Sequence, residues 1–589
     1  MDNGSIADIF DEMAELLELR GENQFRVRAY RNGSKTIREL TEQVSDILAD
    51  KSRDLRTFSG IGDTLADKCK VLVETGKLPQ LEELRANTPA VLVKMTRIPG
   101  VGAKKAMLMQ KELGIQSLEE LRQACLDQKV RALKGFGAKT EEAILAGLDI
   151  AESAALRLRI DRAEHLVQRL KNHLSSCTAI QKMEFAGSYR RGKETIGDID
   201  ILIVSDDHDA VMNRFQEFPV LISVIVRGDT KMSIRVDNQF QVDLRVVPQE
   251  SFGAALQYFT GSKEHNVAVR GRARKLGMTV NEYGVAKIES PDQLLCGRTE
   301  EELYEILGLK WIAPELREGR HELHWAEKDE FPELVQLGDI VGDLHMHTTE
   351  SDGSNSMDEM AAAARARGLQ YIAITDHSKR VSMARGLDAA RLLAQWEVVD
   401  RVNTTRPAGF RILKGIECDI LEAGPLDLPD EVLAQADWVL ASVHYGQKQS
   451  KEQITDRILG ALANPHVDAI AHPTGRLLGS RPPYEVDLQA VFQAAVAHRK
   501  ILELNASPYR LDLSETHLIA AAGHGIPIVI GTDAHSIEGL DVMRFGITQA
   551  RRACLTKQQV VNTWPLDKLL EWVGRSLSTR RACHPKPST

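Results

Sequence analysis

The stretch GSYRRGKETIGDIDILIV, residues 187–204, is the most informative part of this 589-residue sequence. Asp198 and Asp200 lie two residues apart at the start of an apolar run, so on a β-strand both side chains leave the same face. Asp243, in the alternating run QVDLRVV, supplies a third carboxylate. Neighbouring carboxylates are costly unless a cation neutralises them, and Mg²⁺ or Mn²⁺ takes oxygen ligands of this kind. We therefore predict that these three aspartates form a catalytic two-metal site on a sheet.

An Asp-x-Asp pair at a strand end can also simply face solvent. The Gly187-Ser188 loop that precedes the pair in the sequence argues against that interpretation here. Three carboxylates can hold two divalent ions, one of which lowers the pKa of an attacking hydroxyl while the other stabilises a leaving pyrophosphate.

The pattern of apolar residues divides the chain into regions of different structural class. Residues 1–150 are typical of short amphipathic helices separated by glycine turns. From Met183 the runs MEFAG, IDILIVS, VLISVIV, MSIRV and QVDLRVV predict an antiparallel or mixed sheet with some helix. After a polar stretch that follows Gly319, apolar runs alternate with helical stretches to about residue 575, which predicts an α/β barrel. The tail STRRACHPKPST has no apolar periodicity, and we expect it to be disordered.

Length and composition indicate a soluble multidomain protein. A chain of 589 residues exceeds what one hydrophobic core holds, and 43% apolar with 27% charged residues is ordinary for folded domains. The sequence contains no unbroken run of about 18 apolar residues, so we expect no membrane span. The acidic N-terminus lacks the basic-then-apolar order of a secretory signal. The seven cysteines form no CxxC pair, so we expect neither disulfides nor a cysteine zinc site, and we predict a cytoplasmic protein.

Three Gly-x-Gly turns recur in the helical region: Gly60-Ile61-Gly62, Gly100-Val101-Gly102 and Gly135-Phe136-Gly137. Glycines leave backbone amides uncovered at a helix N-terminus, where they can hydrogen-bond a phosphate without reading base sequence. A single turn of this kind is more often a packing hairpin, but three copies indicate binding to the DNA backbone. The net charge of −9 argues against a nucleic-acid partner, yet Lys and Arg outnumber Asp and Glu between residues 51 and 150.

The turns resemble helix-hairpin-helix motifs, with Ala66 and Ala106 as small packing residues after the first two turns and Glu141 at that spacing after the third. The sequence from Phe25 to about Leu309 is similar to family X DNA polymerases. The similarity rests on the aspartate stretch together with Tyr258-Phe259-Thr260-Gly261-Ser262, His265-Asn266 and Arg270.

This resemblance implies a template-directed polymerase that fills short gaps in DNA during base excision repair, using deoxynucleoside triphosphates and Mg²⁺ or Mn²⁺. Ser188 and Arg191 would hold the triphosphate, and Arg270 would contact the template. Gln241 and Lys263 stand where vertebrate repair polymerases have arginine and aspartate, which bears on nucleotide affinity and fidelity. The full expected nucleotide-binding set is Gly187, Ser188, Arg191, Gly197, Tyr258, Phe259, Gly261, Asn266 and Arg270.

The N-terminal residues also look like the small lyase domain of that family, whose nucleophile would fall on Lys68. A Schiff-base lysine needs a depressed pKa, which neighbouring cations such as Arg26 and Lys70 can supply. A solvated surface lysine is the alternative. The expected DNA-binding residues are Arg26, Tyr30, Gly60, Gly62, Gly100, Gly102, Gly135 and Gly137.

The second half contains seven short apolar runs between residues 341 and 535, of which six end in a potential metal ligand and the seventh in Asn505. Ligands at the C-terminal ends of parallel strands converge on one mouth of a barrel. A lone histidine after a strand is more often structural, but nine candidates in register argue for a metal site, and mixed imidazole and carboxylate ligands favour Mn²⁺, Zn²⁺ or Fe²⁺ over Mg²⁺. The candidates are His345, His347, Asp352, His377, Glu417, His444, His472, Asp533 and His535.

This half resembles the polymerase and histidinol phosphatase (PHP) domain, with all nine positions of its trinuclear site present. The resemblance implies up to three ions, with Glu417 bridging two of them, and a 3′→5′ exonuclease with a further activity at abasic sites. Three alternatives stay open: a structural metal platform behind the polymerase, a PHP domain acting on a small-molecule phosphate, and a non-catalytic DNA-binding module.

The resemblances also imply the domain boundaries and the partners. We expect a lyase-like domain at 1–85, a fingers-like domain at 86–150, a palm at 151–255, a thumb at 256–318, a linker at 319–336, the PHP domain at 337–575 and a disordered tail at 576–589. The expected partners are gapped or nicked duplex DNA and deoxynucleoside triphosphates, with no membrane, and the chain is expected to be a monomer.

Overall fold

The computed structural model describes residues 3–39, 44–50, 52–58, 60–96, 98, 101–154, 157–405 and 409–574. The predicted disordered tail lies outside these residues. The chain divides into two compact units, residues 1–157 with 479–482 and residues 158–478 with 483–589, and each is described by itself. No helix in the described ranges is both long enough and apolar enough to cross a membrane.

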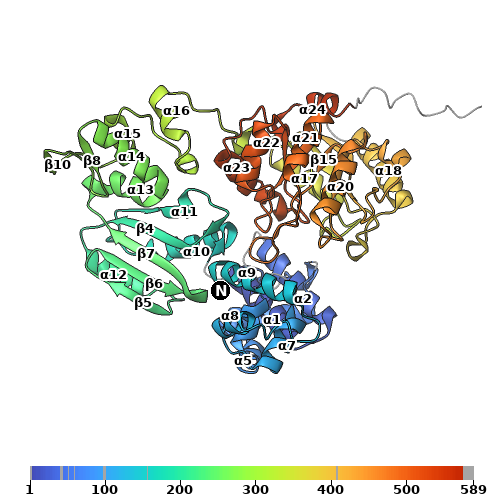
Figure 1. The fold of residues 1–589 in the computed structure, drawn as a ribbon, viewed down its shortest axis with the longest axis horizontal. Coiled ribbons are helices and arrows are strands. Elements are labelled where there is room, and N and C mark those ends of the chain that lie inside the picture. Colours follow the sequence, from blue (N-terminus) through green and yellow to red (C-terminus); the bar gives the residue numbers. More distant parts are fainter. Residues whose placement is uncertain are drawn as a thin grey trace, which may run out of the picture. The chain divides into compact units, whose positions relative to one another are not determined.

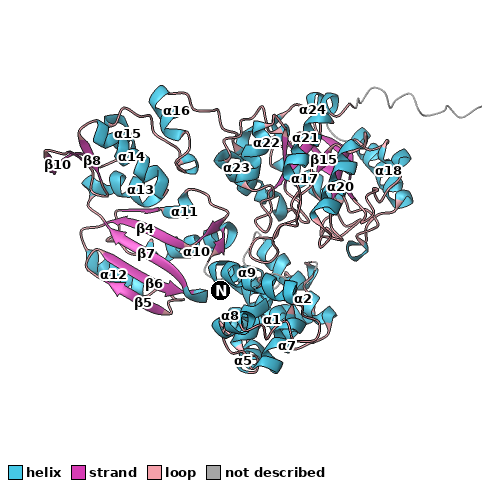
Figure 2. Cartoon of the chain, viewed as in Figure 1, coloured by secondary structure: helices cyan, strands magenta, loops and turns pink. Residues whose placement is uncertain are grey.

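The first unit is helical, as predicted, and its helices pack on two apolar clusters (Figure 2). One cluster includes the buried Phe10, Leu65 and Leu72, and the other includes Met109 and Leu121. The helices are α1 (Asn3–Leu19), α2 (Gln24–Glu39), α3 (Val44–Ala49), α4 (Asp63–Thr75), α5 (Pro79–Ala86), α6 (Ala90–Thr96), α7 (Ala103–Leu113), α8 (Leu118–Leu126) and α9 (Ala138–Ala154).

The second unit begins with a sheet domain whose five strands run in the order β2-β4-β7-β6-β5 (Figure 1). Alternation along β7 buries every second side chain, so one face packs on the core and the other is left for polar residues. Strands β4 and β7 are parallel, and the remaining pairs are antiparallel, which confirms the predicted mixed sheet. The elements are β1 (Leu158–Arg159), α10 (Ile160–Leu174), β2 (Lys182–Phe185), α11 (Gly187–Arg190), β3 (Thr195–Ile196), β4 (Asp198–Val204), α12 (His208–Gln216), β5 (Ser223–Arg227), β6 (Lys231–Val236) and β7 (Phe240–Val246).

A smaller α/β region follows, with a three-stranded antiparallel sheet. Buried His265 ties this region to the chain that leaves it, because its ring nitrogens contact Glu322 and the Tyr304 hydroxyl, each at 2.8 Å. The stretch expected to be a linker therefore holds a short helix and a buried carboxylate. The elements are α13 (Phe252–Thr260), α14 (Lys263–Lys275), β8 (Met278–Val280), β9 (Val285–Lys287), β10 (Ser290–Cys296), α15 (Glu300–Ile306) and α16 (Glu322–Lys328).

The C-terminal part is a seven-stranded parallel sheet with its strands in chain order, which confirms the α/β prediction. Helices cover strands that are buried along their length, as expected for a parallel sheet. A parallel bridge between Met346 and Ala534 joins the two edges, so the sheet closes into a barrel. Its elements are β11 (Gly342–Asp343), α17 (Met357–Ala366), β12 (Tyr371–Ile374), α18 (Ala389–Thr405), β13 (Arg411–Asp419), α19 (Asp430–Leu433), β14 (Trp438–Ser442), α20 (Lys451–Ala463), β15 (Ala469–Ile470), α21 (Leu488–Ala497), β16 (Ile501–Asn505), α22 (Glu515–Gly523), β17 (Ile528–Gly531), α23 (Met543–Arg552) and α24 (Leu566–Trp572).

Candidate active sites

The three aspartates predicted from the sequence come together on the five-stranded sheet. Asp200 on β4 is the direct neighbour of Asp243 on β7, and Asp198 lies two residues earlier on the same face. Desolvation of the Asp200 carboxylate, together with the charges of the adjacent Asp198 and Asp243, raises the pKa of Asp200 to about 7. The site therefore concentrates negative charge on three half-buried carboxylates, which fits divalent cations with oxygen ligands.

The loop before β4 requires glycine at position 187, where it contacts Asp200. Gly187 has φ +64°, and a Cβ at that position would collide with a carboxylate oxygen of Asp200. Gln241, opposite Asp198 in the strand register, donates its side-chain amide to both oxygens of Asp243 at 3.1 Å. A neutral amide orients this carboxylate without cancelling its charge, so the negative charge stays available to a metal ion.

The raised pKa of Asp200 predicts a pH dependence for any metal-dependent reaction at this site. A metal needs the ionised carboxylate, so protons compete with it as the pH falls through about 7. Nucleotide incorporation at limiting Mg²⁺ is expected to rise with pH through this range, and a tenfold increase in Mg²⁺ should lower the midpoint by up to about one pH unit. Single-nucleotide incorporation measured from pH 5.5 to 9 at two Mg²⁺ concentrations checks this. A midpoint pH of incorporation that does not change with the Mg²⁺ concentration would contradict this prediction.

Several residues predicted to bind nucleotide are held by neighbouring groups. The Arg191 guanidinium donates to Thr260 O and, at 3.1 Å, to Glu318. The Asn266 amide donates to Tyr258 O at 2.7 Å and accepts from Gln257 at 2.9 Å, which fixes its orientation. The other predicted residues lie on or beside the same elements: Ser188 on α11, Gly197 before β4, Phe259 on α13, Gly261 at its end and Arg270 on α14.

The nine predicted ligands in the barrel also converge. Among the described residues, three groups have potential ligand atoms that lie within 4.8 Å of one another. The first group shares His347 with the second and His377 with the third. The groups are His347, Asp352, His377 and His535; His345, His347 and Asp533; and His377, Glu417 and His444. The ninth residue, His472, places Nε2 2.9 Å from Glu417 Oε1.

The distances between the buried polar atoms of this cluster are compatible with bound metal ions. His345 Nε2 lies 3.6 Å from oxygens of Glu417 and Asp533, which exceeds hydrogen-bond length, and it has no hydrogen-bond partner in the described part of the chain. Burial alone would lower the pKa of His345, but the surrounding carboxylates, Glu503 first, hold it well above its ordinary value. Burial raises the pKa of Glu417, yet the surrounding imidazoles hold it well below the ordinary range. The cluster thus attracts positive charge and leaves ligand atoms without partners.

A second layer of carboxylates, which the sequence analysis did not identify, orients the histidines. Glu503 on β16 accepts from His345 Nδ1 at 2.5 Å and from the His472 backbone amide at 2.6 Å. Asp419 lies 3.2 Å from His444 Nδ1. Such contacts fix the ring orientation and leave Nε2 for a metal. A glutamate in the wholly buried strand ILELN was the available signal for Glu503.

The glycine turns of the first unit have the geometry expected of exposed amides. Gly62 and Gly102 are the N-caps of α4 and α7, and a Cβ on Gly62, Gly102 or Gly137 would meet no atom within 4 Å. Gly60 and Gly135 have φ +85° and +88°, which favours glycine. Gly100 lies outside the described residues.

The small packing residues differ between the turns in the predicted way. Ala106 is fully buried behind the second turn. Glu141 is buried behind the third, where its carboxylate accepts from the backbone amide and side chain of Arg131. An ion pair thus replaces the small residue in that hairpin.

Lys68 lies on α4 and donates to Gln80 at 2.6 Å. Burial lowers the pKa of its amine, and the charge of Arg26 adds to this effect. A larger fraction of the amine is therefore neutral than for a free lysine, as Schiff-base chemistry requires. Tyr30 packs beside this region against Phe10, with ring centroids 5.7 Å apart.

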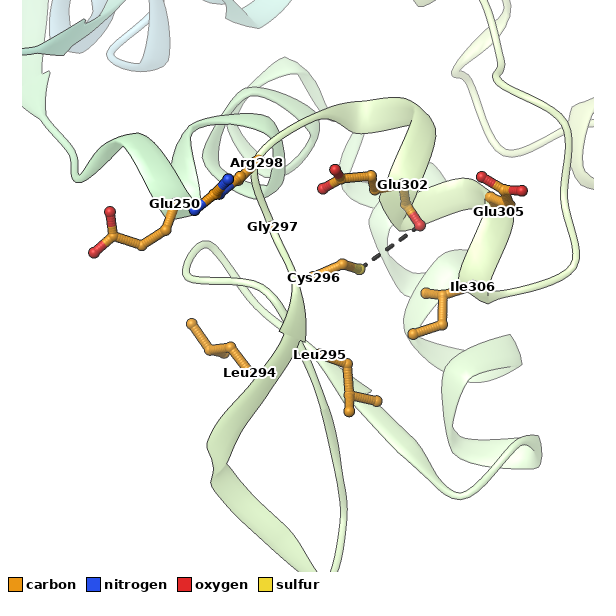
Figure 3. A pocket seen from close by; sticks show the side chains of 9 residues that line it. All are labelled: Glu250, Leu294, Leu295, Cys296, Gly297, Arg298, Glu302, Glu305 and Ile306. Atoms are coloured by element: carbon orange, nitrogen blue, oxygen red, sulfur yellow. Dashed lines mark hydrogen bonds between the residues drawn. The ribbon is translucent and has the colours of Figure 1, made fainter.

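A pocket of about 640 Å³ opens beside β10 and α15 (Figure 3). Leu294, Leu295 and Ile306 form its apolar wall, with Glu250 and Arg298 at its edge. None of the predicted nucleotide, DNA or metal-binding residues lines it, so it is separate from both clusters of candidate metal ligands.

Family models match along most of the chain. They are the helix-hairpin-helix domain (residues 1–78), the SAM-like helix-hairpin-helix tandem (72–149), the DNA polymerase beta palm (158–249), the DNA polymerase beta thumb (255–318) and the PHP domain (343–507).

Relatives resemble either the whole chain or its C-terminal part. The DNA polymerase/3′-5′ exonuclease PolX of Bacillus subtilis (strain 168) is 40% identical over 98% of this chain and 100% of its own length. A probable phosphatase of Thermoanaerobacter sp. (strain X514) is 34% identical over 38% of this chain and 91% of its own length. A probable phosphatase of Acetivibrio thermocellus is 35% identical over 33% of this chain and 80% of its own length.

Proposed function

The chain belongs to the family X DNA polymerases that carry a C-terminal PHP domain, and from this premise we propose that it fills short gaps in DNA and trims 3′ ends. The polymerase assignment is carried by one observation: Asp200 and Asp243 are neighbours on parallel strands, with Asp198 on the same face. This arrangement lies within the part that matches the DNA polymerase beta palm.

In the proposed polymerase reaction, the aspartates would hold two divalent ions, Mg²⁺ or Mn²⁺. When bound, such ions supply positive charge that activates a hydroxyl and stabilises a leaving pyrophosphate. The chain contributes position and orientation: Gln241 holds the Asp243 carboxylate, and the Gly187–Arg191 loop brings Ser188 and Arg191 to the triphosphate side. Exposed amides at Gly62, Gly102 and Gly137 support binding of the DNA backbone in gapped or nicked duplexes.

We propose that the PHP domain is the 3′→5′ exonuclease and that the same centre also cleaves DNA at abasic sites. The Bacillus subtilis relative carries the exonuclease in its name, and all nine ligand positions converge here. Manganese, zinc or iron, up to three ions, suits the mixed imidazole and carboxylate set. When bound, these ions would supply an activated water and charge stabilisation for phosphodiester cleavage. The intact ligand set disfavours a purely structural platform.

One assay tests both activities on one substrate. A labelled primer on a gapped duplex is incubated with Mn²⁺, with and without deoxynucleoside triphosphates. Gap-length extension with nucleotides and stepwise 3′ shortening without them are expected. A wild-type protein that extends but never shortens the primer would favour the structural platform, whereas hydrolysis of histidinol phosphate alone would favour a small-molecule phosphatase.

We further propose that the protein acts as a monomer on chromosomal DNA in the cytoplasm, in base excision repair.

We propose that Lys68 is a lyase nucleophile. Its lowered pKa and partial burial support this role. Borohydride should trap a covalent adduct between the protein and a 5′-deoxyribose phosphate end, and Lys68→Ala should reduce trapping at least about tenfold. Lys77→Ala, which changes an exposed lysine two residues beyond the same helix, is the matched control and should trap normally. Undiminished trapping in Lys68→Ala would assign the role to another amine, and no trapping by the wild type would remove the activity from this protein.

A further inference from the structure

Helix α23 of the PHP domain contacts the loop of the palm that we assign to the triphosphate. Gln549 donates its side-chain amide to Gly192 O at 2.8 Å, and Arg552 donates to Arg191 O. The methyl group of Thr548 lies 2.2 Å from the position that a Cβ on Gly192 would take, so helix and loop are in direct contact. Gln549 and Arg552 thus donate hydrogen bonds to the backbone oxygens of the last two residues of this loop.

Arg552 also joins the loop to the end of the thumb. Its side chain is fully buried and contacts Glu318 at 2.8 Å and Glu515 at 2.7 Å. Glu318 in turn accepts from Arg191 at 3.1 Å and lies 3.3 Å from Lys193. Burial raises the pKa of Glu318, but Arg552 and Arg191 outweigh it and bring the pKa to about 2, so the carboxylate is ionised. Arg552 and Arg191 therefore share one carboxylate, whose side chain is 11% exposed.

The ion pairs of Glu318 restrict the conformation of the loop. An unpaired charge inside a protein is costly, so the loop conformation in which Arg191, Lys193 and Arg552 contact the Glu318 carboxylate is favoured. Gly192 has φ +65°, and the loop reverses direction there, so the carbonyl oxygens of Arg191 and Gly192 need donors to fix them. Those donors come from the PHP domain rather than from the palm.

We propose that Arg552 and Gln549 are positioning residues of the polymerase reaction: helix α23 of the PHP domain holds the Gly187–Gly192 loop in its nucleotide-binding conformation. The inference rests on the proposed polymerase function and on the assignment of this loop to the triphosphate. It means that nucleotide affinity depends on the PHP domain through contacts that include none of its metal ligands.

Another contact between the same helix and the palm provides a matched control. Arg544 pairs with Glu164 on α10 at 2.7 Å, and both side chains are nearly half exposed. Its loss should remove one link between the PHP domain and the palm, while the hydrogen bonds to the backbone oxygens of Arg191 and Gly192 remain in place. An exposed pair of this kind contributes little to stability.

The test compares Arg552→Met, Arg552→Lys, Gln549→Met and Arg544→Met in the full-length protein. Single-nucleotide incorporation on a gapped duplex gives KM for the nucleotide and kcat, and 3′ shortening without nucleotides gives the exonuclease rate. Arg552→Met and Gln549→Met are expected to raise KM about tenfold and about threefold respectively, with kcat within about threefold and the exonuclease rate within about twofold. Arg552→Lys should recover part of the loss in affinity, and Arg544→Met should match the wild type.

Equal KM values in Arg552→Met, Gln549→Met and Arg544→Met would overturn the inference, as would parallel losses of kcat and exonuclease activity, which indicate general destabilisation. Thermal unfolding of each variant identifies misfolding. If Arg552→Met does not fold, Gln549→Met decides, because it removes one hydrogen bond and leaves the charge cluster intact. A wild-type protein that incorporates no nucleotide would refute the proposed function instead.

Discussion

Replacing Asp200 with alanine is expected to reduce nucleotide incorporation by about three orders of magnitude or more, while DNA binding is retained. Asp200 lies between the other two carboxylates, as the direct neighbour of Asp243 in the strand register and two residues from Asp198. Its removal leaves too few oxygen ligands for two ions and changes the charge of the site. The pKa of Asp200, raised to about 7 by burial and by its neighbours, reflects the same crowding of charge.

The measurement is single-turnover incorporation on a gapped duplex, with binding followed separately by a mobility shift at matched salt. Asp209→Ala, an exposed carboxylate at the start of α12 in the same domain, is the control and should behave as the wild type. Exonuclease activity should persist in Asp200→Ala. Incorporation by Asp200→Ala at a rate near that of the wild type would refute the assignment of the polymerase site.

Replacing His345 or Glu417 with alanine is expected to remove 3′ shortening, with a loss of about two to four orders of magnitude, and to spare extension. Both residues are buried in the PHP cluster, where His345 belongs to one ligand group and Glu417 to another. Because the palm carboxylates are supplied by other strands, polymerase chemistry does not depend on these ligands. The two classes of variant should therefore show opposite patterns on one labelled substrate.

His498→Ala is the matched control, since this histidine is exposed at the end of α21 in the same domain. Removal of metal with a chelator should abolish shortening in the wild type, and Mn²⁺ should restore it. Shortening that survives in both His345→Ala and Glu417→Ala would place the nuclease elsewhere or identify a contaminant. Loss of extension in these variants would show that the ligands also support the polymerase domain.

The sequence by itself determined the local features of both centres. The two-residue period of a strand placed Asp198 and Asp200 on one face, and this follows from backbone geometry alone. The C-terminal ends of successive parallel strands lie at one rim, so ligands in register with those ends could be predicted to converge. The fold classes also followed from apolar periodicity, which reports locally on helix and strand. Resemblance to known families then supplied the expected chemistry.

Only the tertiary structure decided which distant residues became neighbours. The parallel register of β4 and β7 sets Asp200 beside Asp243, and Glu503 reaches His345 across 158 residues of sequence. Arg552 donates to a carbonyl oxygen 361 residues earlier in the chain. No local pattern encodes such contacts, because strand register and helix docking depend on the packing of the whole domain. The clustering of the candidate ligand residues was therefore predictable from sequence, whereas the contacts that orient them, such as that of Glu503 with His345, required the tertiary structure.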